Sequence, residues 1–253
     1  MLEEFLKLNA YVFIVTFSRI GTILIFIPVL GSSRFLARGK LFLGLAISFL
    51  LTPIIANILP AMPAKPAELG LVILGEIMAG AFLGLIVRAM YFATQTAGTV
   101  ISFVSGMANT MIYDPVVEQQ SAIVGGFMGS IATLLIFVTN LHHVLIEAMV
   151  ESYMLFQPGV SPNLGDMAQM MARQISDTFI LGVQLSSPFF VMSLAYYMGL
   201  GVLTRLAPQI PVFFVAMPLQ IILSTVVLAL TIGGIMTVYL RNFRDNIQPL
   251  IGS

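Results

Sequence analysis

Six apolar runs, each long enough to cross a lipid bilayer, constrain the fold of this chain more than any other feature. They cover residues 8–30, 41–59, 69–87, 121–150, 178–203 and 212–240. A helix needs about 20 apolar residues to cross a hydrocarbon core of about 30 Å, and a backbone in that core must satisfy its own hydrogen bonds. The polar gaps between the runs are too short for an independent soluble domain. The sequence therefore predicts an all-α membrane protein, built of helical hairpins, with one membrane domain over residues 1–253.

A seventh stretch, residues 89–108, is apolar but also carries threonines, serines and a glutamine. This composition suits a helix packed on protein better than a helix in lipid. Cytoplasmic loops are enriched in Lys and Arg. With six spans the basic residues divide equally between the two sides, and with seven they concentrate on one side. The charge rule mildly favours seven spans; a third interpretation is that several helices are not ordinary spans.

Composition excludes several classes of function. The chain has 58% hydrophobic and 9% charged residues, and its 11 basic residues offset 11 acidic ones, so no global charge favours nucleic acid. The absence of cysteine excludes thiolate metal sites and cysteine nucleophiles. Neither a GxxxxGK phosphate loop nor a GxSxG nucleophile elbow occurs. We expect no enzyme activity, no cofactor, no metal and no nucleic-acid partner.

A polar, proline-rich segment joins the last two apolar runs. Pro208 and Pro211 lack a backbone donor and disfavour helix at the residue before them. They place Gln209 in a tight turn, so we interpret residues 205–211, which begin at Arg205, as the tip of a helical hairpin. Pro218 follows about two turns into the second helix, and we expect it to kink that helix.

Four ionisable residues lie inside apolar runs, and each would cost several kcal/mol if it faced lipid. They are Arg19, Glu76, Arg88 and Glu147. We expect them to be buried against protein or water at helix or subunit interfaces. A structural role is favoured over a proton or ion relay.

Glu76, Gly80, Gly84 and Arg88 recur at every fourth residue and therefore share one face of a helix. The two glycines allow a neighbouring backbone to approach closely, which predicts an assembly face. Glu76 and Arg88 cannot pair within that helix, because twelve residues rise about 18 Å. Each of the two charges therefore needs a partner elsewhere.

Two further patterns are weaker. His143, Glu147 and Glu151 share a helix face beside His142, but they lack the HExxH arrangement and no other histidine completes a nitrogen-rich site. We therefore expect no metal there. Residues 106–120 form a loop rich in Gly, Met, Ser and Asn, whose flexible methionines could close an irregular gap. Composition alone favours an ordinary exposed loop.

Together these residues resemble the FliR/SctT family of type III secretion export-gate proteins over nearly the whole chain. The resemblance rests on Arg19 with Pro28 and the basic loop up to Gly44, on Glu76 with Gly80 and Gly84, on residues 97–115 with Gly106, Asp114 and Pro115, on Asn140 with His142, and on Arg205, Pro208, Gln209, Phe213 and Pro218. The Pro-Gln-x-x-x-Phe pattern is the most specific part. Leu141 departs from the family, which often has a small glycine there.

The resemblance implies a subunit that assembles with FliP-like and FliQ-like chains into a conical gate raised from the inner membrane at the flagellar basal body. Unfolded flagellar proteins pass through this gate, and FlhB-like and FlhA-like components and membrane lipid surround it. Residues 1–177 would be the FliP-like part and residues 178–253 the FliQ-like hairpin. The plug of the lumen would comprise Gly106, Met107, Ala108, Asn109, Thr110, Met111, Asp114 and Pro115.

The tip residues Arg205, Pro208, Gln209 and Pro211 would then contact a neighbouring component, an FlhB-like one. The predicted function is a non-enzymatic structural and gating subunit of the flagellar export apparatus. Two alternatives remain. The first is the injectisome homologue of the same family, and the second is a proton-coupled small-solute transporter that uses Glu76, Arg88 and Glu147.

Overall fold

Helices make up almost all of the chain in the computed structural model, which describes residues 2–28, 36–107, 111–114, 119–160, 163–207, 209 and 212–250. In chain order the elements are α1 (Leu2–Phe26), α2 (Ala37–Ile55), α3 (Pro66–Val104), β1 (Met111–Asp114), β2 (Gln119–Ala122), α4 (Ile123–Val138), α5 (Leu141–Leu155), α6 (Leu164–Leu185), α7 (Ser187–Leu206), α8 (Val212–Ile247) and the 3-10 turn η1 (Gln248–Leu250). The predicted all-α class is confirmed; within the described ranges, the exception is a short two-stranded antiparallel sheet.

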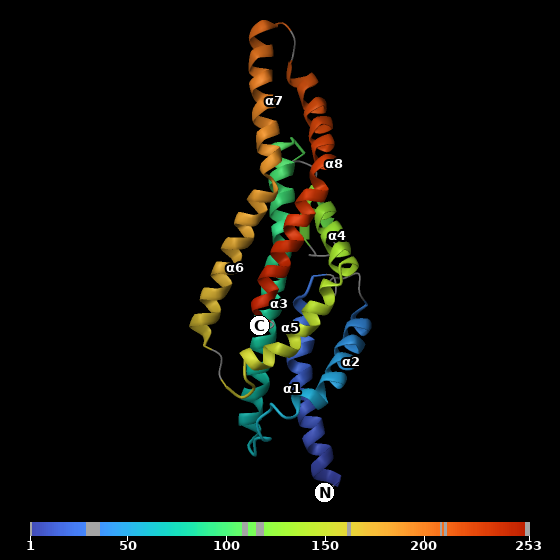
Figure 1. The fold of residues 1–253 in the computed structure, drawn as a ribbon, viewed down its shortest axis with the longest axis vertical. Helices are drawn as coiled ribbons and strands as arrows, with labels where there is room; N and C mark the ends of the chain where they lie inside the picture. The colour runs from blue at the N-terminus through green and yellow to red at the C-terminus, as the bar shows by residue number, and fades with distance from the viewer. Residues whose placement is uncertain are drawn as a thin grey trace.

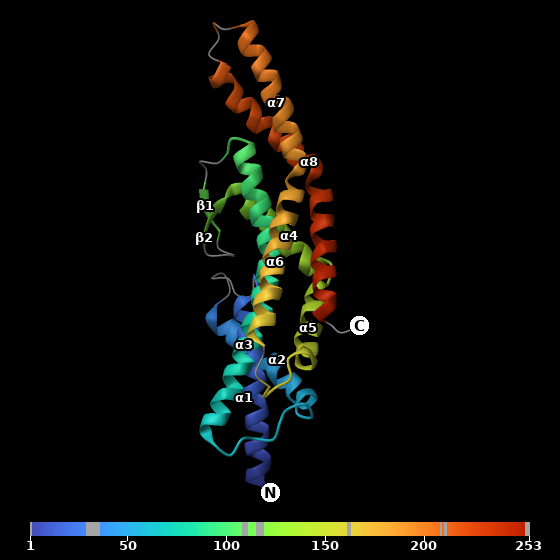
Figure 2. The same ribbon diagram turned by 90° about the vertical axis from the view of Figure 1, so that its left-hand side faces the viewer.

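Helix α3 runs along the middle of the molecule, with α1, α4 and α6 beside it (Figures 1 and 2). It has 39 residues, which corresponds to about 58 Å at about 1.5 Å per residue. Of the interpretations left open for residues 89–108, a separate seventh span is therefore not what the structure shows, because residues 89–104 continue the same helix. No proline or glycine lies between Gly84 and Gly98, so nothing in the chain interrupts the helix that begins at Pro66.

Two other predicted spans are broken into pairs of helices. In residues 121–150, α4 and α5 meet at an angle of 76°, because Asn140 adopts a left-handed conformation with φ of 58° that asparagine tolerates better than most residues. In residues 178–203, α6 ends at Leu185 and α7 starts at Ser187, with Pro188 in its first turn. Helix α6 begins at Leu164, where the Asn163 side chain accepts a hydrogen bond from the Gly165 amide. It therefore also contains the polar segment that precedes the predicted span.

Among the described residues, four helices are long and apolar enough to cross a membrane: α2, α3, α7 and residues 216–247 of α8. The bent pair of α4 and α5 would make a fifth if it counted as one span. The described apolar part of α1, Ala10–Phe26, is shorter. The chain is thus a membrane protein, but its helices do not follow the six or seven regular spans that hydropathy predicts.

Small residues set how closely the helices pack on α3. A Cβ atom on Gly98 would fall on the backbone of Gly125 in α4, and a Cβ on Gly182 of α6 would lie 2.7 Å from the Thr96 Cβ. Around these contacts, side chains from most of the helices form one main core, which includes Ile20, Ile55, Ala93, Met128, Tyr153, Phe189, Tyr239 and Phe243. Helix α3 is therefore the element on which the others assemble.

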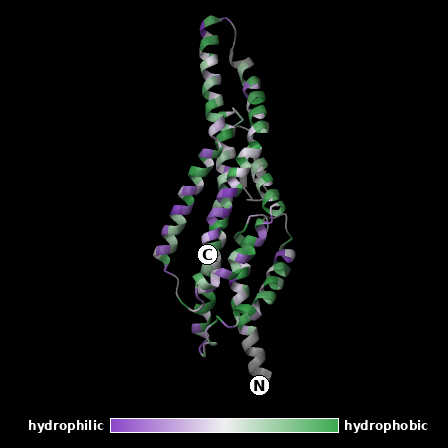
Figure 3. Ribbon diagram, viewed as in Figure 1, coloured by the Kyte–Doolittle hydropathy of each residue, from purple (hydrophilic) through white to green (hydrophobic). Residues whose placement is uncertain are grey.

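Helices α7 and α8 form the predicted C-terminal hairpin, whose connection lies at the end of the molecule opposite the N-terminus (Figure 1). Many of its apolar side chains are exposed in the single chain, and the hairpin is mostly hydrophobic whereas α6 is mixed (Figure 3). Among residues 216–230 of α8, the buried ones are Ala216, Gln220 and Ser224, at every fourth residue. Pro218 lies inside α8, which continues through it and bends along its length (Figure 2).

Candidate functional site

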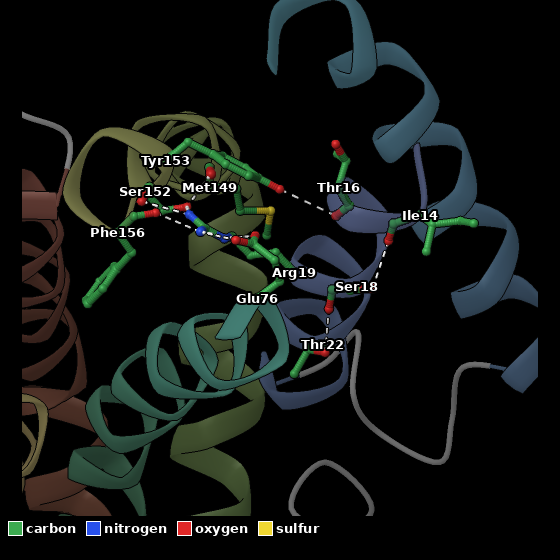
Figure 4. Close-up of polar contacts among 10 residues, drawn as sticks. All are labelled: Ile14, Thr16, Ser18, Arg19, Thr22, Glu76, Met149, Ser152, Tyr153 and Phe156. Carbon is green, nitrogen blue, oxygen red and sulfur yellow. Dashed lines mark hydrogen bonds and ion pairs between the residues drawn. The ribbon is translucent and has the colours of Figure 1, made fainter. Parts of the chain in front are cut away.

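Arg19 of α1 and Glu76 of α3 form a buried, two-pronged ion pair (Figure 4). Arg19 donates from Nε to the Glu76 Oε2 at 2.7 Å and from Nη2 to the Glu76 Oε1 at 2.9 Å. The planar guanidinium matches both carboxylate oxygens, which is the strongest geometry for such a pair. The residues are 1% and 2% exposed, so the partner of each charge lies within the same chain.

The remaining Arg19 donors reach the C-terminal end of α5. Nη1 donates to the Ser152 carbonyl at 2.9 Å, and Nη2 donates to the Phe156 carbonyl at 2.7 Å. The Ser152 carbonyl also accepts from the Phe156 amide, and the carbonyl groups at a helix C-terminus favour a cation. The guanidinium carbon also lies 3.9 Å from the centre of the Tyr153 ring. Arg19 therefore joins α1, α3 and α5, which are distant in sequence, at one point.

The glycine face of α3 receives α1 directly beside this ion pair. A Cβ atom on Gly80 would lie 2.6 Å from the Arg19 carbonyl oxygen, and one on Gly84 would lie 2.6 Å from the Phe26 Cβ. Both distances are far below van der Waals contact, so larger residues would push α1 away. The stripe that the sequence identifies is thus occupied by a helix of the same chain.

The other two predicted buried charges lie elsewhere. Arg88 is half-buried, and its guanidinium lies 5.8 Å from the centre of the Phe92 ring, one turn along α3. Glu147 is exposed in the single chain, so its burial at a subunit interface stays a prediction. Helix α5 packs into the core through Leu145 and Met149 instead, and the i+4 pattern puts Glu147 on another face. Within the described residues no hydrogen bond or ion pair joins Glu76, Arg88 and Glu147.

The histidine pair lies against apolar groups. The His142 ring centre is 5.2 Å from that of Phe137 and 4.2 Å from that of His143. His142 also lines an apolar cavity of about 210 Å³, whose other lining residues include residues of α1, α2, α3, α4, α5 and α8. In the part of the chain that the structure describes, no three His, Cys, Asp or Glu side chains come together to hold a metal ion.

The predicted plug loop begins at the C-terminal end of α3. Gly106 has φ of 74°, a left-handed conformation that glycine adopts without strain. The Met107 amide donates to the Ser102 carbonyl at 2.8 Å, the 6→1 bond of a Schellman cap.

Part of that loop forms two paired strands, which the sequence did not predict. Strands β1 and β2 are antiparallel, with Met111 opposite Ala122 and Asp114 opposite Gln119, and they lie beside α3 and α4 (Figure 2). The pairing satisfies backbone groups that a loop near an apolar core would leave without partners. Ala108, Asn109, Thr110 and Pro115 lie outside the described residues.

The predicted tip lies between α7 and α8. Arg205 is exposed in the last turn of α7, and Gln209 is exposed in the turn that follows. Pro208 and Pro211 lie outside the described residues. The tip is far from the Arg19–Glu76 pair, which is surrounded by α1, α3 and α5 (Figures 1 and 4).

Sequence reasoning missed one functional candidate, Gln220 of α8. It is 5% exposed, and its amide donates to the Val104 carbonyl at 2.7 Å and to the Tyr197 hydroxyl at 3.2 Å. These contacts link the C-terminal hairpin to the end of α3 where the plug loop starts. The sequence signal that could have identified Gln220 is a polar amide inside an apolar run, two residues after Pro218.

Comparison with known proteins gives matches along nearly the whole chain. Residues 10–246 match the family described as bacterial export proteins, family 1. The chain is 31% identical to the flagellar biosynthetic protein FliR of Caulobacter vibrioides, over 94% of each chain. It is 28% identical to the flagellar biosynthetic protein FliR of Bacillus subtilis, over 94% of this chain and 92% of the relative. It is 24% identical to the Yop proteins translocation protein T of Yersinia pestis, over 70% of this chain and 69% of the relative.

Proposed function

Since this chain belongs to the bacterial export proteins of family 1, the family of FliR, we propose that it is a structural and gating subunit of the flagellar type III protein export apparatus. The single observation that carries the proposal is the family match, which extends from α1 to α8. The relative from Yersinia pestis is named for Yop translocation, whereas the relatives with higher identity are named as flagellar proteins. The flagellar system is therefore favoured over the injectisome.

We place the protein in the bacterial inner membrane at the flagellar basal body. Its partners in this proposal are FliP-like and FliQ-like subunits, FlhB-like and FlhA-like components, and the unfolded flagellar proteins that pass through. The exposed apolar side chains of the α7–α8 hairpin, such as Val191 and Leu230, support contact with lipid or neighbouring subunits. In this proposal the hairpin acts as the FliQ-like part, and the division between residues 177 and 178 falls inside α6.

Within the proposed gate, the plug loop of residues 106–120 blocks the lumen, and we call it the closure segment. The Arg19–Glu76 pair has a structural role, because every polar contact that it makes holds α1, α3 and α5 together. The tip around Arg205 and Gln209 contacts an FlhB-like component. We assign no catalytic role to any residue.

A proton-coupled transporter would need carboxylates that can exchange protons along one path. Glu76 has both oxygens bonded to Arg19, and Glu147 lies on an exposed face of α5. This arrangement favours a subunit held together by its charges over a relay.

The decisive experiment is deletion of the gene followed by complementation, together with co-expression of the chain with FliP-like and FliQ-like subunits. We expect loss of filaments and motility on deletion and co-purification of the three chains. A chain that purifies as a stable monomer, together with a deletion strain that still swims, contradicts the proposal. Loss of effector secretion with intact motility would instead identify an injectisome component.

A further inference from the structure

We propose that Gln220 is a positioning residue that ties the α7–α8 hairpin to the C-terminal end of α3 and so fixes where the closure segment begins. We call these contacts the Gln220 tether: the side chain of Gln220 with the Val104 carbonyl and the Tyr197 hydroxyl. The inference rests on the proposed closure role of residues 106–120. It adds a residue outside that segment which holds it in place.

The Val104 carbonyl, which can only accept a hydrogen bond, orients the amide of Gln220. Its nitrogen has two N–H groups; one donates to the Val104 carbonyl at 2.7 Å, and the other donates to the Tyr197 hydroxyl at 3.2 Å. Its Oε1 lies 3.6 Å from the position that a Cβ on Gly106 would occupy. The side chain therefore packs directly beneath the left-handed glycine at which the chain leaves α3.

The tether also completes the C-terminal cap of α3. A helix leaves its last four carbonyls without intrahelical partners. Here the carbonyls of Ile101, Ser102 and Phe103 accept from the amides of Ser105, Met107 and Gly106. The Val104 carbonyl accepts from Gln220 instead. A residue of α8 thus caps the end of α3, and this contact couples α8 to α3.

On the hairpin side, the same part of α8 is held by α7. Tyr196 donates its hydroxyl to the Ala216 carbonyl, and the neighbouring Tyr197 accepts from Gln220. Pro218 lies between these two α8 positions and contributes no backbone donor. A proline makes a helix easier to bend at that point, so the side-chain contacts fix a geometry that the backbone alone leaves free. Movement of the hairpin would consequently be transmitted to Gly106.

The test compares Gln220→Met and Tyr197→Phe with Gln184→Met, an exposed glutamine on α6 that serves as a control. Methionine keeps the length of glutamine and removes the donor. Because the natural chain has no cysteine, spin labels can be attached through Phe103→Cys on α3 and Ile222→Cys on α8, both exposed, in the assembled gate. Pulsed electron resonance then measures the distance distribution between the labels, and planar-bilayer recording measures ion leak.

We expect Gln220→Met to broaden the distance distribution, with a roughly fivefold rise in the undocked population, as the loss of one buried hydrogen bond would produce. Tyr197→Phe should broaden it less, and Gln184→Met should not change it. Ion leak should rise with the broadening while the complex still assembles. An unchanged distance distribution in Gln220→Met overturns the tether. A broadened distribution without leak supports the tether and overturns the closure role assigned to residues 106–120.

Discussion

Replacement of Arg19 by methionine should be among the most destabilising single changes in this chain. It leaves the Glu76 carboxylate, which is 2% exposed, without its partner. Breaking a buried ion pair by removing one member costs about 3–5 kcal/mol. The Phe156 carbonyl also loses the donor that Arg19 supplies, at about 1–3 kcal/mol, whereas the Ser152 carbonyl keeps the Phe156 amide as a donor. The expected loss in the free energy of unfolding is therefore at least about 4 kcal/mol.

The double variant Arg19→Met with Glu76→Met separates these contributions. It removes the stranded carboxylate but leaves the Phe156 carbonyl without the donor that Arg19 supplies. It should consequently be more stable than Arg19→Met alone by about 3–5 kcal/mol. Such recovery is the non-additivity expected for residues in direct contact.

The free energy of unfolding can be measured by SDS titration of the full-length chain in mixed micelles, followed by far-ultraviolet circular dichroism. Arg173→Met, an exposed arginine on α6, is the control and should change stability by no more than about 0.5 kcal/mol. A double variant as unstable as Arg19→Met, or less stable, refutes the reasoning. The buried carboxylate would then not be what destabilises the single variant.

Three further predictions follow from the same structure. Gly84→Ala should lower the free energy of unfolding by about 1–3 kcal/mol in the same titration, because its Cβ would lie 2.6 Å from the Phe26 Cβ. The control is Gly75→Ala, where nothing lies within 4 Å of the added atom. Equal losses of stability in the two variants would contradict the packing argument. Replacing Met107 and Met111 together with glycine should raise ion leak through the reconstituted gate without preventing assembly, and unchanged leak counts against the closure segment. Arg205→Glu at the exposed tip should reduce swimming and export in soft-agar and secretion assays, and normal motility would remove the partner contact from the proposal.

Hydropathy predicted the class of the fold but not the ends of its helices. The apolar runs identify a helical membrane protein, and the proline-rich segment identifies the hairpin of α7 and α8. The separation of the apolar stretches 69–87 and 89–108 assumed that each helix matches one bilayer thickness. Helix α3 is instead continuous, because no residue there breaks it. The break at Asn140 depends on a single left-handed residue, which periodicity does not reveal.

The partners of the charges could be predicted only in part. The cost of a charge in an apolar run shows that Arg19 and Glu76 need partners. They lie 57 residues apart along the chain, so the sequence does not show that they pair with each other. Glu147 follows the same sequence rule and is exposed in the single chain, because the rule states only that a charge avoids lipid. Gln220 escaped notice because a neutral amide in an apolar run gives a weaker signal than a charge.

The length of α3 has a consequence for how cells handle this protein before assembly. A helix of about 58 Å is nearly twice as long as a hydrocarbon core of about 30 Å is thick. Lipid alone therefore cannot cover the apolar surface along α3 and the helices packed beside it. Newly made chains that find no partner would present that surface to water and become substrates for membrane proteases. We expect the amount of this subunit in the cell to follow the supply of its partners rather than the rate of its own synthesis.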